Sequence, residues 1–160
     1  MIDPAKLKQV KRLDQSKVKY LVVHCTASPP KANLSVIDVE RMHIRDRGWA
    51  TIGYHYLIKR DGTLEEGRPL THQGAHVNGF NQVSIGVCLV GGISDNKLKS
   101  PENNFTIEQF YALEDILIEL KKKFPKASIA GHRDFPNVKK DCPCFDAKKW
   151  YASLWNEANA

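Results

Sequence analysis

A chain of 160 residues is long enough to form one domain with a sizeable hydrophobic core, so neither disulfide bonds nor a second domain is required for stability. No apolar run approaches the ~20 residues of a membrane-spanning helix, which argues against insertion into a bilayer. The formal net charge of +6 favours an anionic partner, which could be a cell-wall polymer, a nucleic acid or an acidic protein surface.

The N-terminal residues 1–17 are basic and have no clear apolar period. We expect them to form an arm that is mobile or lies along the surface. They lack the apolar core of a signal peptide, so we expect the chain to stay in the cytoplasm until a separate pore releases it. The chain also has four cysteines, of which Cys142 and Cys144 are too close in sequence for an unstrained bridge, and we expect free thiols.

The first predicted strand and helix follow this arm. Residues 18–25 form a mostly apolar run, typical of a central strand that is covered on both faces. Ser35 and Asp38 then have the spacing of a capping box, which predicts a helix that ends near Gly48. His43 lies in this helix, where we expect it to pack or to make a buried hydrogen bond.

The middle of the chain predicts a hairpin, a long loop and a second buried strand. Residues 51–59 are aromatic and β-branched, and the Asp-Gly turn at 61–62 folds them back on residues 64–68. Residues 71–82 read as a long polar loop, and such loops in compact domains are often functional. Residues 84–90 are a nearly continuous apolar strand.

The last third of the chain predicts two helices and one strand. Thr106 and Gln109 form a second capping-box pattern, and apolar residues follow at helical spacing up to Lys123. Residues 127–130 form the strand, and Asp146 is placed to cap the final helix.

This order of elements indicates an α/β (α+β) fold with a mixed central β-sheet flanked by about three helices. We therefore expect a basic arm at 1–17 and a single catalytic domain at 18–160, which we expect to be a monomer.

Three residues in these elements have the chemistry of metal ligands. His24 and His132 each follow a short apolar run, and Cys142 lies in a proline-containing loop. Two imidazoles and one thiolate suit zinc and leave a fourth position for water or substrate, which predicts hydrolysis. The alternative is that these are ordinary partly buried residues, because no local CxxC or HExxH pattern is present.

Several motifs in this order resemble the zinc-dependent N-acetylmuramoyl-L-alanine amidases, above all the single-domain phage lysozymes of that family, which are related to peptidoglycan-recognition proteins. The motifs are Val-Val-His-Cys-Thr-Ala (22–27), Ile-Gly-Tyr-His-Tyr-Leu-Ile-Lys-Arg-Asp-Gly-Thr (52–63), Gly-Ala-His-Val-Asn-Gly-Phe-Asn (74–81), Ser-Ile-Gly-Val-Cys-Leu-Val-Gly-Gly (84–92), Gly-His-Arg-Asp (131–134) and Lys-Asp-Cys-Pro-Cys-Phe-Asp (140–146). The likeness runs from about residue 18 to the C-terminus.

The resemblance implies a role for particular residues. It assigns one Zn²⁺ ion to three ligands: His24, His132 and Cys142. It places Tyr54 and Lys140 beside the metal, where they would stabilise an oxyanion or position water. It places His76 in the substrate groove, with packing as the alternative. Cys144 is not required by the family pattern, and we expect a packing thiol there, with a competing metal ligand as the alternative.

The implied function is cleavage of the amide bond between N-acetylmuramic acid and L-alanine in peptidoglycan, by a phage or prophage endolysin. One alternative is a module that recognises peptidoglycan without cleaving it, although relatives that lose catalysis typically lose the thiol ligand that Cys142 supplies. Another is a second role, since the phage lysozymes also bind and inhibit the phage RNA polymerase; this would involve the arm at 1–17. Direct nucleic-acid binding is not expected, because no recognition motif is present.

Overall fold

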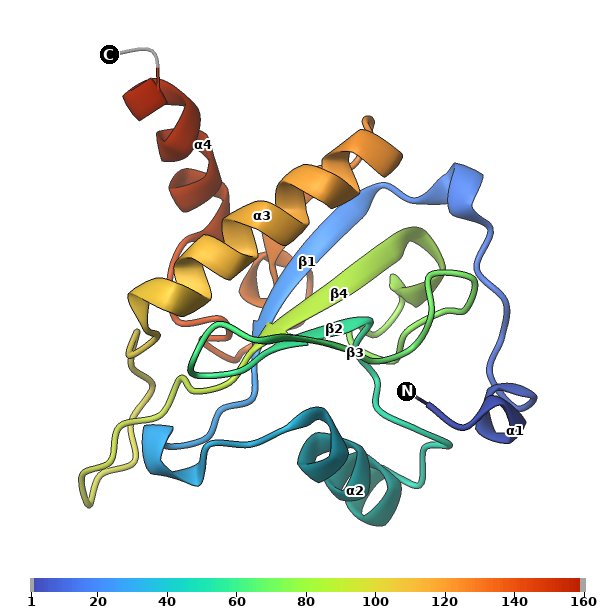
Figure 1. The fold of residues 1–160 in the computed structure, drawn as a ribbon, viewed down its shortest axis with the longest axis horizontal. Helices are drawn as coiled ribbons and strands as arrows, with labels where there is room; N and C mark the ends of the chain where they lie inside the picture. Colours follow the sequence, from blue (N-terminus) through green and yellow to red (C-terminus); the bar gives the residue numbers. More distant parts are fainter. Residues whose placement is uncertain (1, 159–160) are drawn as a thin grey trace.

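A five-stranded mixed sheet forms the centre of the computed structural model, which describes residues 2–158 (Figure 1). Its strands are β1 (Tyr20–Cys25), β2 (Tyr56–Ile58), β3 (Leu64–Glu66), β4 (Ser84–Leu89) and β5 (Ser128–Gly131). They lie in the order β3-β2-β4-β1-β5. Strands β2, β4, β1 and β5 run parallel, and β3 pairs with β2 in the antiparallel direction.

Strand β1 is the central element that the apolar run at 18–25 predicts. It pairs with β4 on one side and with β5 on the other. Side chains alternate between the two faces of a strand. Leu21 and Val23 belong to the larger hydrophobic cluster, whereas Val22 packs in a separate cluster on the opposite face, which is also the face that His24 shares.

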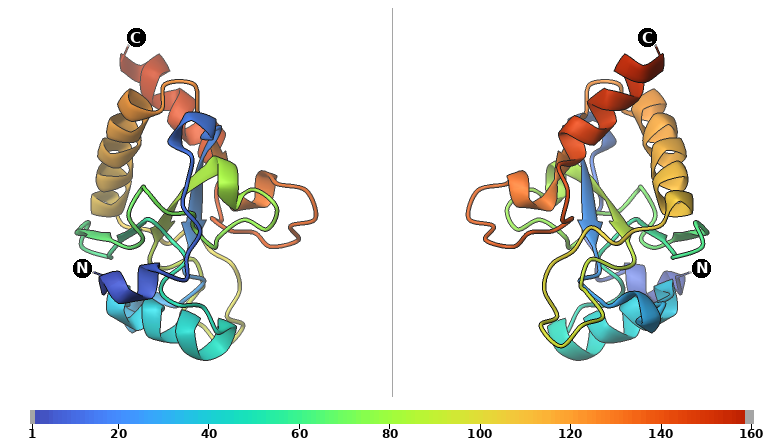
Figure 2. Two further views of the ribbon diagram at one scale, coloured as in Figure 1. Left: turned by 90° about the vertical axis from the view of Figure 1, so that its right-hand side faces the viewer. Right: turned by 90° about the vertical axis from the view of Figure 1, so that its left-hand side faces the viewer.

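Three helices flank this sheet, and a one-turn helix, α1 (Pro4–Leu7), precedes it. The three are α2 (Val36–Arg47), α3 (Ile107–Lys123) and α4 (Ala147–Ala158). Figure 2 shows α3 on one side of the sheet and the segment after β5 on the other. Apolar side chains of α3 pack on Leu21 and Val23, and α2 contributes Val39 to a cluster on the opposite face. The predicted fold class is confirmed.

The local signals at the helix starts are also confirmed. Ser35 with Asp38, and Thr106 with Gln109, form complete capping boxes at α2 and α3. At α4, the amide of Lys149 donates to Asp146 Oδ1 over 3.1 Å.

The predicted strand at 51–59 is wrong in its first half, because β2 begins only at Tyr56. Just before Tyr56 the backbone still follows the register of the sheet: His55 donates its amide to the Gly86 carbonyl of β4, and the Tyr54 carbonyl accepts from the amide of Arg68. The pairing stops at Gly53, whose amide donates to His43 Nδ1 and whose carbonyl accepts from the amide of Ala75. The hairpin itself is present, since β2 pairs with β3.

The N-terminal segment lies along the surface. The Leu13 side chain is buried in the larger cluster, and its amide donates to the Thr71 carbonyl over 2.8 Å. Lys6 Nζ lies 2.9 Å from Glu40 Oε1 on α2. Whether residues 1–17 act as a separate functional segment stays a prediction. Among the described residues, no helix combines the length and apolar character needed to cross a membrane.

Candidate metal centre

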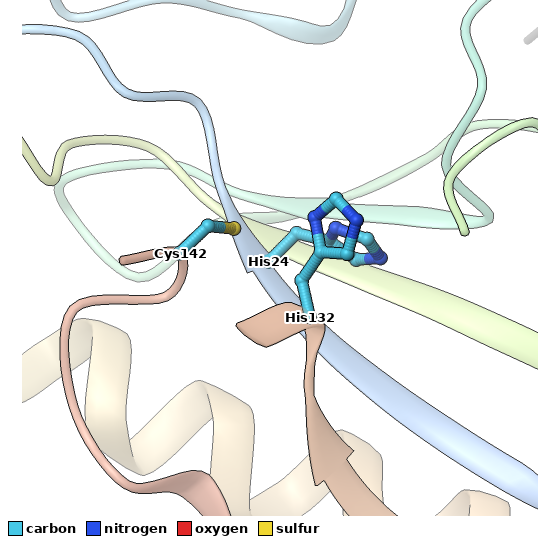
Figure 3. A group of neighbouring side chains, drawn as sticks. All are labelled: His24, His132 and Cys142. Carbon is cyan, nitrogen blue, oxygen red and sulfur yellow. The ribbon is translucent and has the colours of Figure 1, made fainter. Parts of the chain in front are cut away.

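Three side chains from distant parts of the chain meet beside the end of β1. They are His24, His132 and Cys142, whose candidate ligand atoms all lie within 4.8 Å of one another. Figure 3 shows them rising from β1, from the segment directly after β5, and from the loop before α4. Nitrogen and sulfur donors at this separation can contact one ion after small side-chain movements.

The parallel pairing of β1 with β5 brings the two histidines together. Val23 is in register with Gly131, so His24 and His132 directly follow a matched pair of residues. Their ring centroids lie 4.6 Å apart. In the sequence, each of the two apolar runs ends in a histidine. The two histidines meet in one site because these runs form adjacent parallel strands.

The backbone holds Cys142 against this pair. The amide of Cys25 lies 3.1 Å from Cys142 Sγ, and the carbonyl of Cys142 accepts from the amide of Arg133 over 2.8 Å. These two contacts fix the position of the Cys142 sulfur beside the end of β1.

The surroundings keep the two imidazoles neutral. Burial lowers the pKa of His24 well below its usual value, and the neighbouring His76 and His132 lower it further. Partial burial lowers the pKa of His132, and the positive charge of Lys140 acts in the same direction. A neutral imidazole has the free lone pair that a metal ion needs.

This donor set fits a metal ion of borderline softness. Two imidazole nitrogens and one thiolate sulfur are usual for zinc, and three protein ligands leave one position open, as catalytic sites do. A structural zinc site would normally be closed by a fourth protein ligand.

Tyr54 and Lys140, which the sequence predicted beside the metal, both lie near His24. The Tyr54 ring centroid is 5.1 Å from that of His24. Burial raises the pKa of Tyr54, and the nearby sulfur atoms of Cys88 and Cys142 raise it further, so the hydroxyl keeps its proton at neutral pH. Lys140 is exposed, and its charge is close enough to lower the pKa of both His24 and His132.

His76 is buried beside His24. Its Nδ1 lies 2.8 Å from His24 Nε2, and its Nε2 lies 3.1 Å from Ser84 Oγ. Asn81 Oδ1 accepts from the amides of His76 and Val77, which fixes the loop that carries the ring. The sequence predicted a substrate contact here; the structure gives both ring nitrogens a protein partner.

Cys144 is not part of the candidate metal group. Its Sγ lies 3.4 Å from the Gly92 carbonyl, to which the thiol donates, and the neighbouring Cys25 sulfur raises its pKa above the usual value. The candidate metal group contains Cys142 and not Cys144. This arrangement supports the packing thiol over the competing ligand.

Sequence reasoning did not identify Ser84, Asn81 or Gly86 as parts of the site. One signal was available, since a glycine inside an apolar strand often marks a close approach of another group. A Cβ atom at Gly86 would lie 2.8 Å from Cγ and from Nδ1 of His76, so the strand accommodates the ring only because this residue has no side chain.

Comparison with known proteins assigns the family. Residues 14–145 match the profile described as N-acetylmuramoyl-L-alanine amidase. The endolysin of Klebsiella phage KP32 is 41% identical over 147 residues, with 92% of each chain covered. The endolysin of Escherichia phage T7 is 43% identical over 131 residues, covering 82% of this chain and 83% of that one.

A solved structure agrees. The Ph2119 endolysin from the Thermus scotoductus MAT2119 bacteriophage Ph2119 superposes with a TM-score of 0.74 at 29% identity, covering 91% of this chain and 90% of that one. The family match at 14–145 includes all five strands, α2, α3 and the three candidate ligands. The chain belongs to the N-acetylmuramoyl-L-alanine amidase family.

Proposed function

We propose that this amidase uses one Zn²⁺ ion, held by His24, His132 and Cys142, to cleave peptidoglycan between N-acetylmuramic acid and L-alanine as the endolysin of a phage or prophage. The observation that supports the metal most directly is the convergence of two neutral imidazoles and a thiol within 4.8 Å. Family membership supports the bond that is cleaved.

The chemistry follows from the donor set. A zinc ion at this position would supply Lewis-acid polarisation of the scissile carbonyl and a water acidified to a pKa of about 7. The protein's own part is to keep the two imidazoles neutral, to hold the thiol beside them and to present hydrogen-bond donors to the substrate oxygen. The protonated Tyr54 hydroxyl and the Lys140 ammonium are the two donors that we assign to the oxyanion of the tetrahedral intermediate.

The net charge of the chain supports the choice of substrate. A formal charge of +6 favours binding to an anionic cell-wall polymer, especially at low ionic strength. We propose that the chain reaches this polymer after a separate pore-forming protein releases it from the cytoplasm.

A clearing assay tests the proposal. Permeabilised Gram-negative cells are incubated with native protein, with protein treated with chelator, and with treated protein to which zinc is restored. We expect clearing that the chelator abolishes and zinc restores. If zinc-loaded protein binds cell walls and leaves them intact, the chain is a recognition module and the proposal fails.

Two further predictions rest on the resemblance alone. Binding to a phage RNA polymerase would be tested by a pull-down with the polymerase of the cognate phage, and a monomeric state by size-exclusion chromatography with light scattering.

A further inference from the structure

A chain of buried hydrogen bonds leads away from the metal centre. His24 Nε2 lies 2.8 Å from His76 Nδ1, His76 Nε2 lies 3.1 Å from Ser84 Oγ, and Ser84 Oγ lies 2.8 Å from the carbonyl of Phe80. The residues His24, His76 and Ser84 are 1%, 8% and 0% exposed. Each link is therefore largely shielded from water, and the partners within the protein decide where the protons lie.

The last hydrogen bond of this series, from Ser84 to Phe80, determines which atom donates in the other two. The Phe80 carbonyl can only accept, so the single Ser84 hydroxyl proton points to it. Ser84 Oγ is then the acceptor for His76, which places a proton on His76 Nε2. In a neutral imidazole the other nitrogen carries only a lone pair, so His76 Nδ1 accepts from His24 Nε2–H.

Metal binding by His24 requires the same donor, His24 Nε2, in the bond to His76. One proton lies between His24 Nε2 and His76 Nδ1. If it belonged to His76, the lone pair of His24 Nε2 would be used to accept it, and a neutral His24 would carry its own proton on Nδ1. Such a ring offers no nitrogen to an ion. Only the direction set by Ser84 leaves His24 with a free lone pair, on Nδ1.

We propose that His76 is a positioning residue that fixes the Nε2–H tautomer of His24, so that Nδ1 is the metal-binding atom, and that Ser84 fixes the tautomer of His76 in turn. The proposal rests on the proposed metal site. It replaces the substrate contact that the sequence predicted at His76, because both ring nitrogens are used within the protein. Hydrogen bonds of this kind orient ligating histidines and raise their basicity.

Two glycines leave room for the His76 ring. The His76 ring lies against β4 at Gly86 and against the loop at Gly74, where added Cβ atoms would approach it to 2.8 and 2.5 Å. The ring is thus confined between two glycines, and its Nδ1 faces His24.

Nitrogen NMR of the histidine rings tests the proton positions directly. In ¹⁵N-labelled full-length protein loaded with zinc, we expect His24 to be protonated at Nε2 and metal-bound at Nδ1, and His76 to be protonated at Nε2. A proton on His76 Nδ1, or zinc on His24 Nε2, would overturn the proposal. This readout does not depend on activity, so it separates the proposal from the assignment of peptidoglycan as substrate.

Zinc affinity provides the second test. For His76→Leu we expect affinity to fall by about 10- to 100-fold, the usual effect of losing a partner of a ligating histidine. His76→Asn keeps an acceptor near the position of Nδ1 and should recover much of this loss, and Ser84→Ala should cause a smaller loss. Ser94→Ala, which removes a buried hydroxyl elsewhere, is the matched control and should bind zinc as the native protein does. Native zinc affinity in folded His76→Leu would refute the role of His76.

Discussion

The amide nitrogen of Cys25 lies 3.1 Å from the sulfur of Cys142, although 117 positions separate the two residues along the chain. This contact docks the loop before α4 onto the end of β1, next to His24. It also orients the sulfur toward the two histidines. The candidate metal centre therefore depends on the docking of a loop as well as on the pairing of β1 with β5.

The first prediction concerns the sulfur itself. Cys142→Ser should reduce zinc affinity by more than ~100-fold, because it removes a metal ligand. Losing a residue that only hydrogen-bonds to a ligand costs up to about 100-fold. Isothermal titration with zinc measures this. Cys144→Ser is the matched control, since the Cys144 thiol donates to the Gly92 carbonyl, and it should retain native affinity. Equal losses in both variants would mean that Cys144 is a ligand.

The second prediction concerns Lys140. Its side chain is exposed, so Lys140→Ala should leave the free energy of unfolding nearly unchanged. The rate of peptidoglycan hydrolysis should fall on the order of 10²–10³-fold, the typical cost of removing one oxyanion donor. Lys139→Ala removes the neighbouring exposed lysine and should keep full activity. If the two variants lose activity equally, Lys140 acts only through net charge.

The third prediction concerns the Tyr54 hydroxyl. Tyr54→Phe keeps the ring that packs against the cluster containing Ile52 and Leu57, so the fold and zinc binding should be preserved. We expect kcat to fall on the order of 10²-fold, because the donor to the substrate oxygen is lost. The control is Tyr111→Phe on α3, where the side chain is 60% exposed. Native kcat in Tyr54→Phe would remove this residue from the mechanism.

The fourth prediction is acid destabilisation of the zinc-free protein. Burial lowers the pKa of His43 and of His55 to about 4, from an ordinary value of 6.5. Between these values the unfolded chain binds more protons than the folded chain, so the free energy of unfolding should fall as the pH drops from about 6.5 toward 4. Urea denaturation across this range measures the slope.

A substitution at His43 measures how much this residue contributes to the pH dependence of the free energy of unfolding. His43 Nδ1 accepts from the amide of Gly53 over 3.0 Å, and asparagine at this position offers an acceptor in a similar place without a titrating ring. His43→Asn should therefore show a shallower loss of stability with falling pH. An unchanged slope would mean that His43 does not contribute.

The sequence predicted the elements whose signals are local. The apolar runs of β1 and β4 and the two capping boxes lie within a few residues, so each could be recognised without knowing the fold. The same holds for His24, which lies near the end of β1, and for His132, which directly follows β5.

The remaining features depend on contacts between distant segments. The strand at 51–59 is cut short where Gly53 bonds to His43 and Ala75, and the bond from His76 to Ser84 depends on the path of the loop between them. Leu13 enters the core although its segment is basic and lacks an apolar period. No local pattern encodes such pairings, which is why they could not be predicted from the sequence.

The most direct measurement of the central claim is the identification of the products released from purified peptidoglycan. Zinc-loaded protein should liberate stem peptides with new L-alanine amino termini, leave the glycan strands without new reducing ends, and release nothing after chelation. New reducing sugars, cleavage within the stem peptide, or undiminished cleavage with the metal removed would contradict a zinc-dependent N-acetylmuramoyl-L-alanine amidase.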